Sequence, residues 1–232
     1  RSLMYRHDAE LGWFPEANSS HTFLGSQKIN VVHNNLGFRD HHHGRKTKKR
    51  IAFIGDSFTW GYDVEQPERF TEKLQKLVPN WEVLNLGVSG YGTAQELLLL
   101  QKYFDHYQPD IVFLVFDTES DHLDNKLNKI YGDYFKPYFV NELDRLVLKG
   151  LPVSKNYIYH LRSHTFLSKS FLYRTLAKVT IHITTPGLIA NANISGDLIA
   201  AMRDFVVAKG AVFVIGFTRV RDDDWELSLF DI

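Results

Sequence analysis

Short apolar runs alternate along the chain with longer stretches that have apolar residues at helical spacing. The apolar runs are Ile51–Ile54, Trp81–Leu86, Ile111–Phe116 and Ala211–Phe217. Runs of this length, bounded by glycine or polar residues, are typical of strands buried on both faces. The stretches Glu68–Val78, Thr93–Tyr107 and Asp197–Ala208 carry apolar residues three or four positions apart, which predicts helices.

This alternation predicts an α/β protein with a mostly parallel sheet covered by helices. Right-handed crossovers bring the carboxyl ends of such strands to one edge of the sheet, where ligands bind. Four segments would lie at that edge: Gly55–Ser57, Gly87–Gly92, Asp117–Asp121 and Thr218–Asp224. We therefore expect any ligand site to be built from these segments.

The rest of the chain has weaker patterns. Residues 1–50 are an irregular polar and aromatic lead-in, which we expect to pack as an N-terminal extension on one domain formed by residues 51–232. An insertion at about 117–182 starts with an acidic and aromatic part. Its later part, 154–182, is expected to be mostly helical, either packed against the sheet or forming a lid or acyl-binding wall.

Composition narrows the classes of function. The 27 basic residues balance the 27 acidic ones, so no global field recruits nucleic acid or an anionic membrane. The absence of cysteine excludes disulfides and thiolate chemistry. No apolar run approaches the ~20 residues that span a bilayer. Since the chain begins at Arg1, we expect upstream residues to be missing; a signal or membrane anchor there would make the protein extracytoplasmic or membrane-anchored, and the compartment stays open.

Ser57 is the first candidate for chemistry. It follows a predicted buried strand and Gly55-Asp56, where a turn should meet the start of a helix. Free backbone N–H groups and the positive helix end lie beside a serine so placed, which suits a nucleophile whose oxyanion needs donors. The alternative is that Asp56 and Ser57 only cap a helix.

The second strand ends in the glycine-rich segment Gly87-Val88-Ser89-Gly90-Tyr91-Gly92. Glycine allows the backbone to approach a ligand closely, so the N–H of Gly90 is a candidate oxyanion donor, while a plain turn is the alternative. The spacing matches neither a dinucleotide fingerprint nor a P-loop.

Three blocks resemble the SGNH/GDSL hydrolase family: Gly55–Thr59, Asn85–Gly92 and Pro109–Val112. Asn35–Asp40 resembles the lead-in of bacterial members with an N-terminal extension, and Lys136–Phe139 resembles a later insertion in some of them. The resemblance covers about residues 30–140. It implies a three-layer α/β/α sandwich, similar to a flavodoxin-like fold, and acyl transfer through a serine ester.

In such a mechanism Ser57 would attack the carbonyl carbon, and the N–H groups of Ser57 and Gly90 would hold the oxyanion. The family's third donor, an asparagine before aspartate, corresponds here to Ser120, which has a shorter reach and one hydroxyl proton. Asn125 is the alternative donor. Losing one good donor costs on the order of 10²-fold in rate.

The family's base and its orienting acid come from an Asp-x-x-His motif near the C-terminus, and the C-terminal part of this sequence does not contain one. No histidine follows His182, and Asp222-Asp223-Asp224 precedes Trp225. We expect the C-terminal end of the fold, a fifth strand and a closing helix, to be missing. His122, just after the third predicted strand, is the alternative base.

The sequence therefore predicts a serine-dependent ester hydrolase or deacylase acting on a small-molecule or carbohydrate ester, without metal or organic cofactor. Acyl transfer to a sugar hydroxyl is a close variant of this chemistry. A catalytically incomplete binding or scaffolding protein is the rival from another class. A dinucleotide or phosphate enzyme is the third hypothesis.

Overall fold

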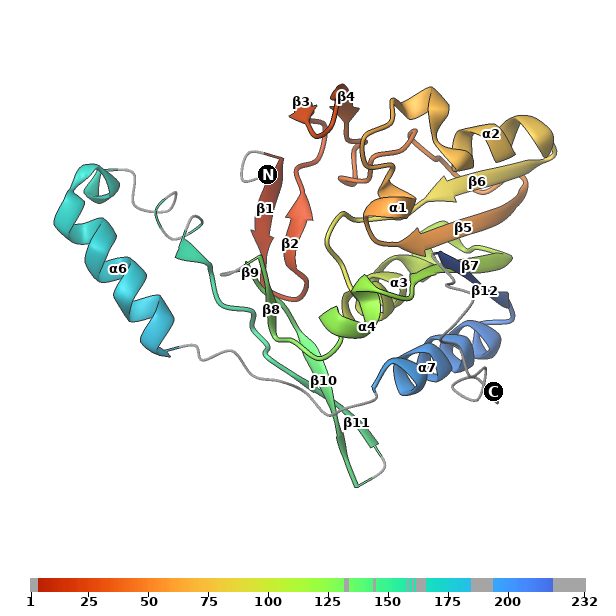
Figure 1. Cartoon of the computed structure of the whole chain (residues 1–232). Helices are drawn as coiled ribbons and strands as arrows, with labels where there is room; N and C mark the ends of the chain where they lie inside the picture. The colour runs from red at the N-terminus through yellow and green to blue at the C-terminus, as the bar shows by residue number, and fades with distance from the viewer. Residues whose placement is uncertain are drawn as a thin grey trace.

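The computed structural model describes residues 4–131, 134–143, 145–157, 159, 161, 166–184 and 194–218. Its centre is a parallel four-stranded sheet with strand order β12-β7-β5-β6 (Figure 1). The strands are β5 (Lys49–Gly55), β6 (Trp81–Asn85), β7 (Ile111–Asp117) and β12 (Val212–Thr218). Their bounds agree with the apolar runs of the sequence to within two residues, so the predicted parallel sheet is confirmed.

Helices pack on both faces of this sheet, which confirms the α/β/α class. On one face, α3 (Thr93–Tyr107) packs beside α7 (Ser195–Ala208), where the rings of Phe104 and Phe205 meet edge to face with centroids 5.4 Å apart. On the opposite face lies α2 (Phe70–Leu77), preceded by the short helices α1 (Ser57–Trp60) and η1 (Gln66–Glu68). The ring of Phe70 packs edge to face against the ring of Phe53 of β5, with the ring centroids 5.1 Å apart.

Residues 4–50 contain two antiparallel hairpins, so the expected irregular lead-in is wrong. The hairpins pair β1 (Tyr5–Asp8) with β2 (Gly12–Pro15) and β3 (Ser20–Leu24) with β4 (Lys28–Val32). Their apolar side chains enter the main core: Trp13 and Phe14 are buried, and Trp13 packs against Tyr91 with ring centroids 5.5 Å apart. Burial of these aromatic residues, rather than local periodicity, fixes the strands.

The segment after β7 begins with α4 (Ser120–Asp124) and continues as two hairpins. These pair β8 (Lys129–Ile130) with β9 (Tyr134–Phe135) and β10 (Tyr138–Glu142) with β11 (Arg145–Lys149). The short helix η2 (Leu167–Lys169) and the helix α6 (Phe171–Thr184) follow. Figure 1 shows α6 standing apart from the sheet and from the other helices.

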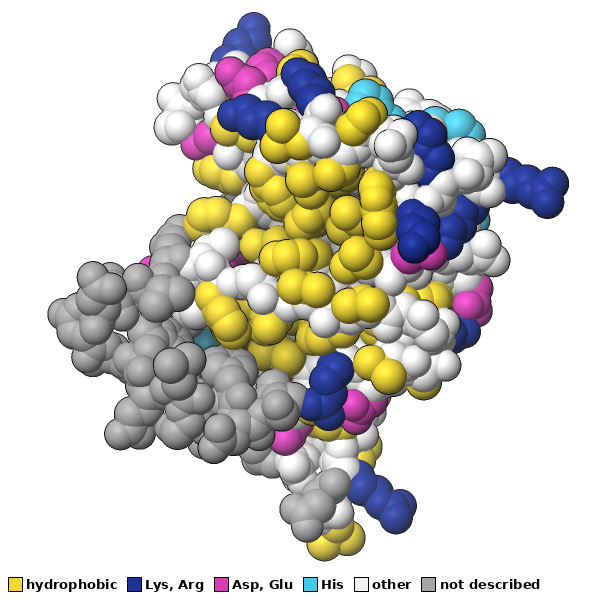
Figure 2. Space-filling view, turned by 90° about the vertical axis from the view of Figure 1, so that its right-hand side faces the viewer, with side chains coloured by type: hydrophobic (Ala, Val, Ile, Leu, Met, Phe, Trp, Pro, Cys, Tyr) yellow, Lys and Arg dark blue, Asp and Glu magenta, His cyan; other side chains and the backbone are white. Residues whose placement is uncertain are grey.

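Part of the sheet face that α2 contacts is open. A hollow of about 410 Å³ there is lined by residues of α1, α2, β5, β7 and β12, among them Phe113 and Phe217. Figure 2 shows hydrophobic side chains gathered on this side of the molecule. Residues 219–232 lie outside the described residues. They include most of the segment Thr218–Asp224, which the sequence analysis places at the ligand edge of the sheet. In the part of the chain that is described, no helix is long and apolar enough to cross a membrane.

Candidate functional site

The strand order brings the three predicted site residues to one edge of the sheet. Strand β5 lies between β6 and β7, so Ser57, directly after β5, is flanked on one side by the glycine-rich loop that contains Gly90. On its other side is the segment after β7, which contains Ser120. Because parallel strands place their carboxyl ends at the same edge, this is the region where ligands of open α/β sheets bind.

Ser57 is the first residue of α1, and Asp56 is its N-cap. The Asp56 carboxylate accepts a hydrogen bond from the amide of Phe58 at 2.9 Å, and the Ser57 hydroxyl donates to the same carboxylate at 3.4 Å. Burial raises the pKa of Asp56, and the nearby Asp117 has the same effect. Hydrogen bonds from Phe58 and Ser57 oppose the shift, and the resulting pKa is about 6. The capping interpretation of Asp56 is therefore correct, and Ser57 remains half-exposed beside it.

The glycine-rich loop is held tightly against α1. A β-carbon at Gly87 would lie 2.4 Å from the backbone nitrogen of Trp60, so only glycine fits there. Gly90 has a φ of +85°, a left-handed conformation that favours glycine. A side chain at Gly90 would also meet Ile130 and the ring of Tyr131, because the β8–β9 hairpin packs over this loop.

Asn85 joins the glycine-rich loop to α1 and α2. Its side-chain amide donates to the carbonyl of Thr59 at 2.7 Å and to the hydroxyl of Thr71 at 3.0 Å. Its side-chain oxygen accepts from the amide of Gly87 at 3.1 Å. All these contacts lie in the core, since Asn85 is buried, and they fix the start of the loop.

The N-terminal segment supports the same region through Arg39 and Asp40. The buried guanidinium of Arg39 donates to the carbonyls of Gly61 at 2.5 Å and Val64 at 2.8 Å, just after α1. Burial and, to a smaller extent, the neighbouring Arg69 lower the pKa of Arg39 to about 10. Asp40 accepts from the backbone amide of Asn85 at 2.8 Å. The Asn35–Asp40 block of the sequence thus stabilises the loop after α1 and the start of the glycine-rich loop.

Ser120 begins α4 on the other side of Ser57. Its hydroxyl oxygen is buried and has no hydrogen-bond partner among the described residues. Asp121, the next residue, is fully buried and accepts from the amide of Asp117 at 2.7 Å, which fixes the turn between β7 and α4. An unpartnered buried hydroxyl is costly to the folded state.

The structure also reveals buried ionisable groups that sequence reasoning missed. Burial raises the pKa of Glu96, in the first turn of α3, and the nearby Asp121 raises it further. Burial likewise raises the pKa of Asp121, with Asp56 adding to the effect. Lys136 lies among these acids and donates to the carbonyl of Asp124 at 2.5 Å; burial lowers its pKa to about 8. The only signal in the sequence was Lys136 itself, at the start of the Lys136–Phe139 block.

The recorded side-chain hydrogen bonds of the two alternative site residues, His122 and Asn125, are made with α3 and α7. The Nδ1 atom of His122 lies 3.5 Å from the hydroxyl of Ser195 at the start of α7, and burial lowers the pKa of His122. The side-chain amide of Asn125 donates to the hydroxyls of Thr93 and Ser195 at 3.0 and 3.1 Å. The side chain of Asn125 thus links the N-terminal ends of α3 and α7. In the described part of the chain, the Ser57 hydroxyl donates to the carboxylate of Asp56, and no histidine forms a hydrogen bond with it.

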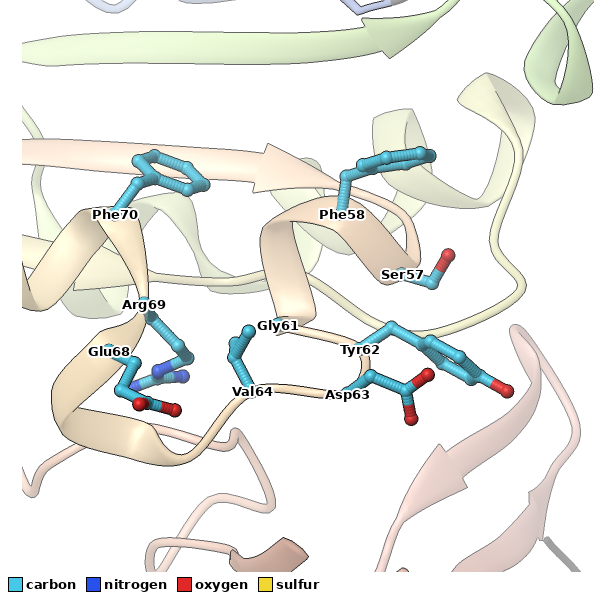
Figure 3. A pocket seen from close by; sticks show the side chains of 9 residues that line it. All are labelled: Ser57, Phe58, Gly61, Tyr62, Asp63, Val64, Glu68, Arg69 and Phe70. Carbon is cyan, nitrogen blue, oxygen red and sulfur yellow. The ribbon is translucent and has the colours of Figure 1, made fainter. Parts of the chain in front are cut away.

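A hollow of about 630 Å³ opens beside Ser57 (Figure 3). Figure 3 shows the rings of Phe58 and Phe70 pointing the same way, away from the loop that carries Tyr62. The same two rings line the neighbouring apolar hollow over the sheet. The lining is mixed in polarity and comprises Ser57, Phe58, Gly61, Tyr62, Asp63, Val64, Glu68, Arg69 and Phe70. A ligand at Ser57 would therefore contact both apolar and charged groups.

The described residues contain no cluster of His, Cys, Asp or Glu suited to a metal ion. The consecutive histidines His41, His42 and His43 contact three different residues. His41 contacts Glu72 at 3.1 Å, His42 contacts Asn35 at 2.6 Å, and His43 contacts Asp40 at 2.9 Å. Their rings therefore do not converge on one ion.

Fold and site together define an α/β/α protein with a serine at the ligand-binding edge of its sheet. No protein-family model and no curated protein matches the sequence. The chain is similar to the solved structure of TesA, at 12% identity and a TM-score of 0.41, over 78% of this chain and 67% of TesA.

Two further solved structures are similar over part of their length. AlinE4, an SGNH-hydrolase family esterase, has 25% identity and a TM-score of 0.31, over 35% of this chain and 46% of AlinE4. The psychrotrophic esterase EstA from Pseudoalteromonas sp. has 12% identity and a TM-score of 0.38, over 72% of this chain and 58% of EstA. SGNH/GDSL proteins are thus among the solved structures to which this fold is similar.

Proposed function

We propose that this chain is a serine-dependent ester hydrolase or deacylase with Ser57 as its nucleophile. The observation that carries the proposal is the placement of Ser57. It starts a helix at the carboxyl edge of the sheet and lines a hollow of about 630 Å³. The glycine-rich loop and the unpartnered hydroxyl of Ser120 flank it. Acyl transfer needs the nucleophile and the hydrogen-bond donors for the oxyanion close to each other, and this edge of the sheet brings them together.

In the proposed reaction the oxygen of Ser57 attacks the ester carbonyl, and the alcohol leaves with a proton to give an acyl-serine. Water then cleaves this ester and releases the acid. The amide of Gly90 and the hydroxyl of Ser120 hold the oxyanion. The amide of Ser57 is the third donor, although it also interacts with Asp56 and must share its proton between the two.

A base for Ser57 is still required, because a serine hydroxyl is a weak nucleophile at neutral pH. His122 contacts Ser195 instead. We infer that the base comes from residues other than those described. Transfer of the acyl group to a sugar hydroxyl would use the same first step, with the sugar replacing water in the second.

A second candidate is a binding or scaffolding protein that kept the fold without catalysis. Two observations favour it: no described histidine contacts Ser57, and Ser120 stands where the resembled family has asparagine. Such a protein would use the hollow beside Ser57 for a ligand that it does not cleave.

Labelling with a fluorophosphonate probe, followed by intact-mass measurement, separates the two candidates. We expect one adduct on the protein and none on Ser57→Ala. The matched control is Ser170→Ala, which removes an exposed serine before α6 and should leave labelling unchanged. An adduct that persists in Ser57→Ala contradicts the proposed nucleophile. A protein that takes no adduct at all supports the binding candidate.

A further inference from the structure

Residues 145–196 differ from the rest of the chain in charge. This segment of 52 residues contains no aspartate or glutamate and seven basic residues. The basic residues are Arg145, Lys149, Lys155, Arg162, Lys169, Arg174 and Lys178. Because the whole chain has a formal net charge of zero, the remainder carries a net charge of −7. The charge balance of the whole chain therefore hides a strongly basic segment.

Helix α6 lies within this basic segment and exposes an apolar face. The exposed fractions are 76% for Phe171, 66% for Leu172, 56% for Leu176 and 49% for Val179. At about 100° per residue, these four side chains and Thr175 fall on one side of the helix. Soluble proteins normally bury such a face, so its exposure indicates a surface that meets something apolar.

The position of α6 leaves this face accessible. Figure 1 shows the helix projecting from the body of the molecule, at a distance from α1, the helix that begins at Ser57. Before it, Phe166 and Leu167 are also exposed, at 84% and 47%. Arg174 is exposed as well and lies at the border of the apolar face, whereas Ala177 is buried on the other side of the helix. This is the arrangement of an amphipathic helix with a basic flank.

We propose that α6 docks the protein on an anionic lipid surface, with Phe171, Leu172, Leu176 and Val179 inserted at the level of the headgroups. Insertion removes these side chains from water, and the basic segment is attracted by the lipid charge. The negative remainder of the chain is repelled, which orients the molecule with α6 toward the lipid. A neutral apolar partner or a second copy of the chain would explain the apolar face but not the 52 residues without an acid.

Flotation of the full chain with vesicles tests the proposal. One set consists of phosphatidylcholine alone and the other of phosphatidylcholine mixed with phosphatidylglycerol. We expect flotation with the mixed vesicles that weakens as salt is raised. Leu172→Glu combined with Leu176→Glu should lower the partition coefficient at least about ten-fold, since two inserted leucines are lost. Arg174→Glu should lower it by roughly five-fold or more.

Matched controls place the same charges on α2, outside the basic segment. Leu77→Glu replaces a leucine that is 78% exposed, and Lys76→Glu reverses an exposed lysine. Both should float like the unaltered protein. Circular dichroism and the thermal transition show whether each variant is folded, and fluorophosphonate labelling without vesicles tests Ser57 separately from docking.

Three results would overturn the proposal. The first is an absence of flotation with the mixed vesicles. The second is equal flotation with neutral vesicles, which would remove the role of charge. The third is a dimer in sedimentation that dissociates in the Leu172→Glu, Leu176→Glu variant, which would make a second copy the occupant of the α6 face.

Discussion

The two loops on either side of Ser57 are built in opposite ways. In the loop after β6, Asn85 makes three side-chain hydrogen bonds, and the amide of Val88 donates to the carbonyl of Gly55 at 3.0 Å. In the segment after β7, the hydroxyl of Ser120 and one carboxylate oxygen of Asp121 are buried without a partner among the described residues. No buried side-chain polar atom of the first loop is left without a partner among the described residues, whereas the second segment leaves two.

The difference shows which interactions hold each of the two loops in place. The loop after β6 is positioned by satisfied hydrogen bonds, including one from the backbone amide of Asn85 to the carboxylate of Asp40. The segment after β7 is surrounded by buried acids, since Glu96 and Asp121 lie close together and Asp56 adds to their repulsion. Buried groups with displaced pKa values concentrate at functional sites, and such sites lower stability. We therefore expect the first loop to govern stability and the second to govern chemistry.

The largest effect is expected from Asn85→Ala, which breaks the satisfied loop. The change leaves the carbonyl of Thr59 and the amide of Gly87 buried without partners, each at a cost of about 1–3 kcal/mol. We expect the free energy of unfolding to fall by about 3–5 kcal/mol in urea titration. The control Asn35→Ala removes an exposed amide and should change it by less than about 0.5 kcal/mol. Equal effects of the two variants would contradict the comparison.

A smaller effect, of opposite sign, is expected from Glu96→Gln. The pKa of Glu96 is raised in the folded state, so the native protein holds a proton that the unfolded chain releases. The native state is therefore favoured most below the unfolded pKa of about 4 and loses stability as the pH rises toward the folded pKa. Glutamine removes this loss. The free energy of unfolding should exceed that of the unaltered protein by more than about 1 kcal/mol at about pH 8, and the difference should shrink toward about pH 5.

Asp56→Asn serves as the control for the pH window of that experiment. The pKa of Asp56 is raised only to about 6, so the advantage of asparagine should grow up to about pH 6 and then stay constant. The advantage of Glu96→Gln should continue to grow above that pH. Identical pH profiles for the two variants would show that Glu96 is not buried as an acid with a strongly raised pKa.

The elements predicted from the sequence are those with local signals. The four core strands are apolar runs bounded by glycine or polar residues, and Ser57 and Gly90 follow two of them directly. The hairpins of residues 5–32 were missed because Tyr5–Asp8 is only four residues long and mixed in polarity. Its pairing depends on burial of Trp13 and Phe14 against distant residues, which no local pattern records.

The buried acids were missed for a related reason. A glutamate in an amphipathic helix is normally expected to face water, yet all five residues Thr93–Leu97 of α3 are buried. The burial of Glu96 comes from the packing of α4 and of the segment around Lys136, which lie far away in the sequence. Similarly, the face of α6 was expected to pack or to form a lid, and its exposure became visible only in the structure.

The smallest effect on stability is expected from Ser120→Ala, and this variant tests the chemical half of the comparison. Alanine removes a buried hydroxyl that has no partner in the described structure, so the free energy of unfolding should stay the same or rise by less than about 1 kcal/mol. If Ser120 holds the oxyanion, the rate of fluorophosphonate labelling at Ser57 should fall on the order of 10²-fold. Ser120→Asn offers a longer donor at the same position and should keep or raise that rate. A labelling rate that is the same in all three proteins would mean that the unpartnered hydroxyl does not face the reacting atoms, and that the oxyanion depends on the amides of Gly90 and Ser57 alone.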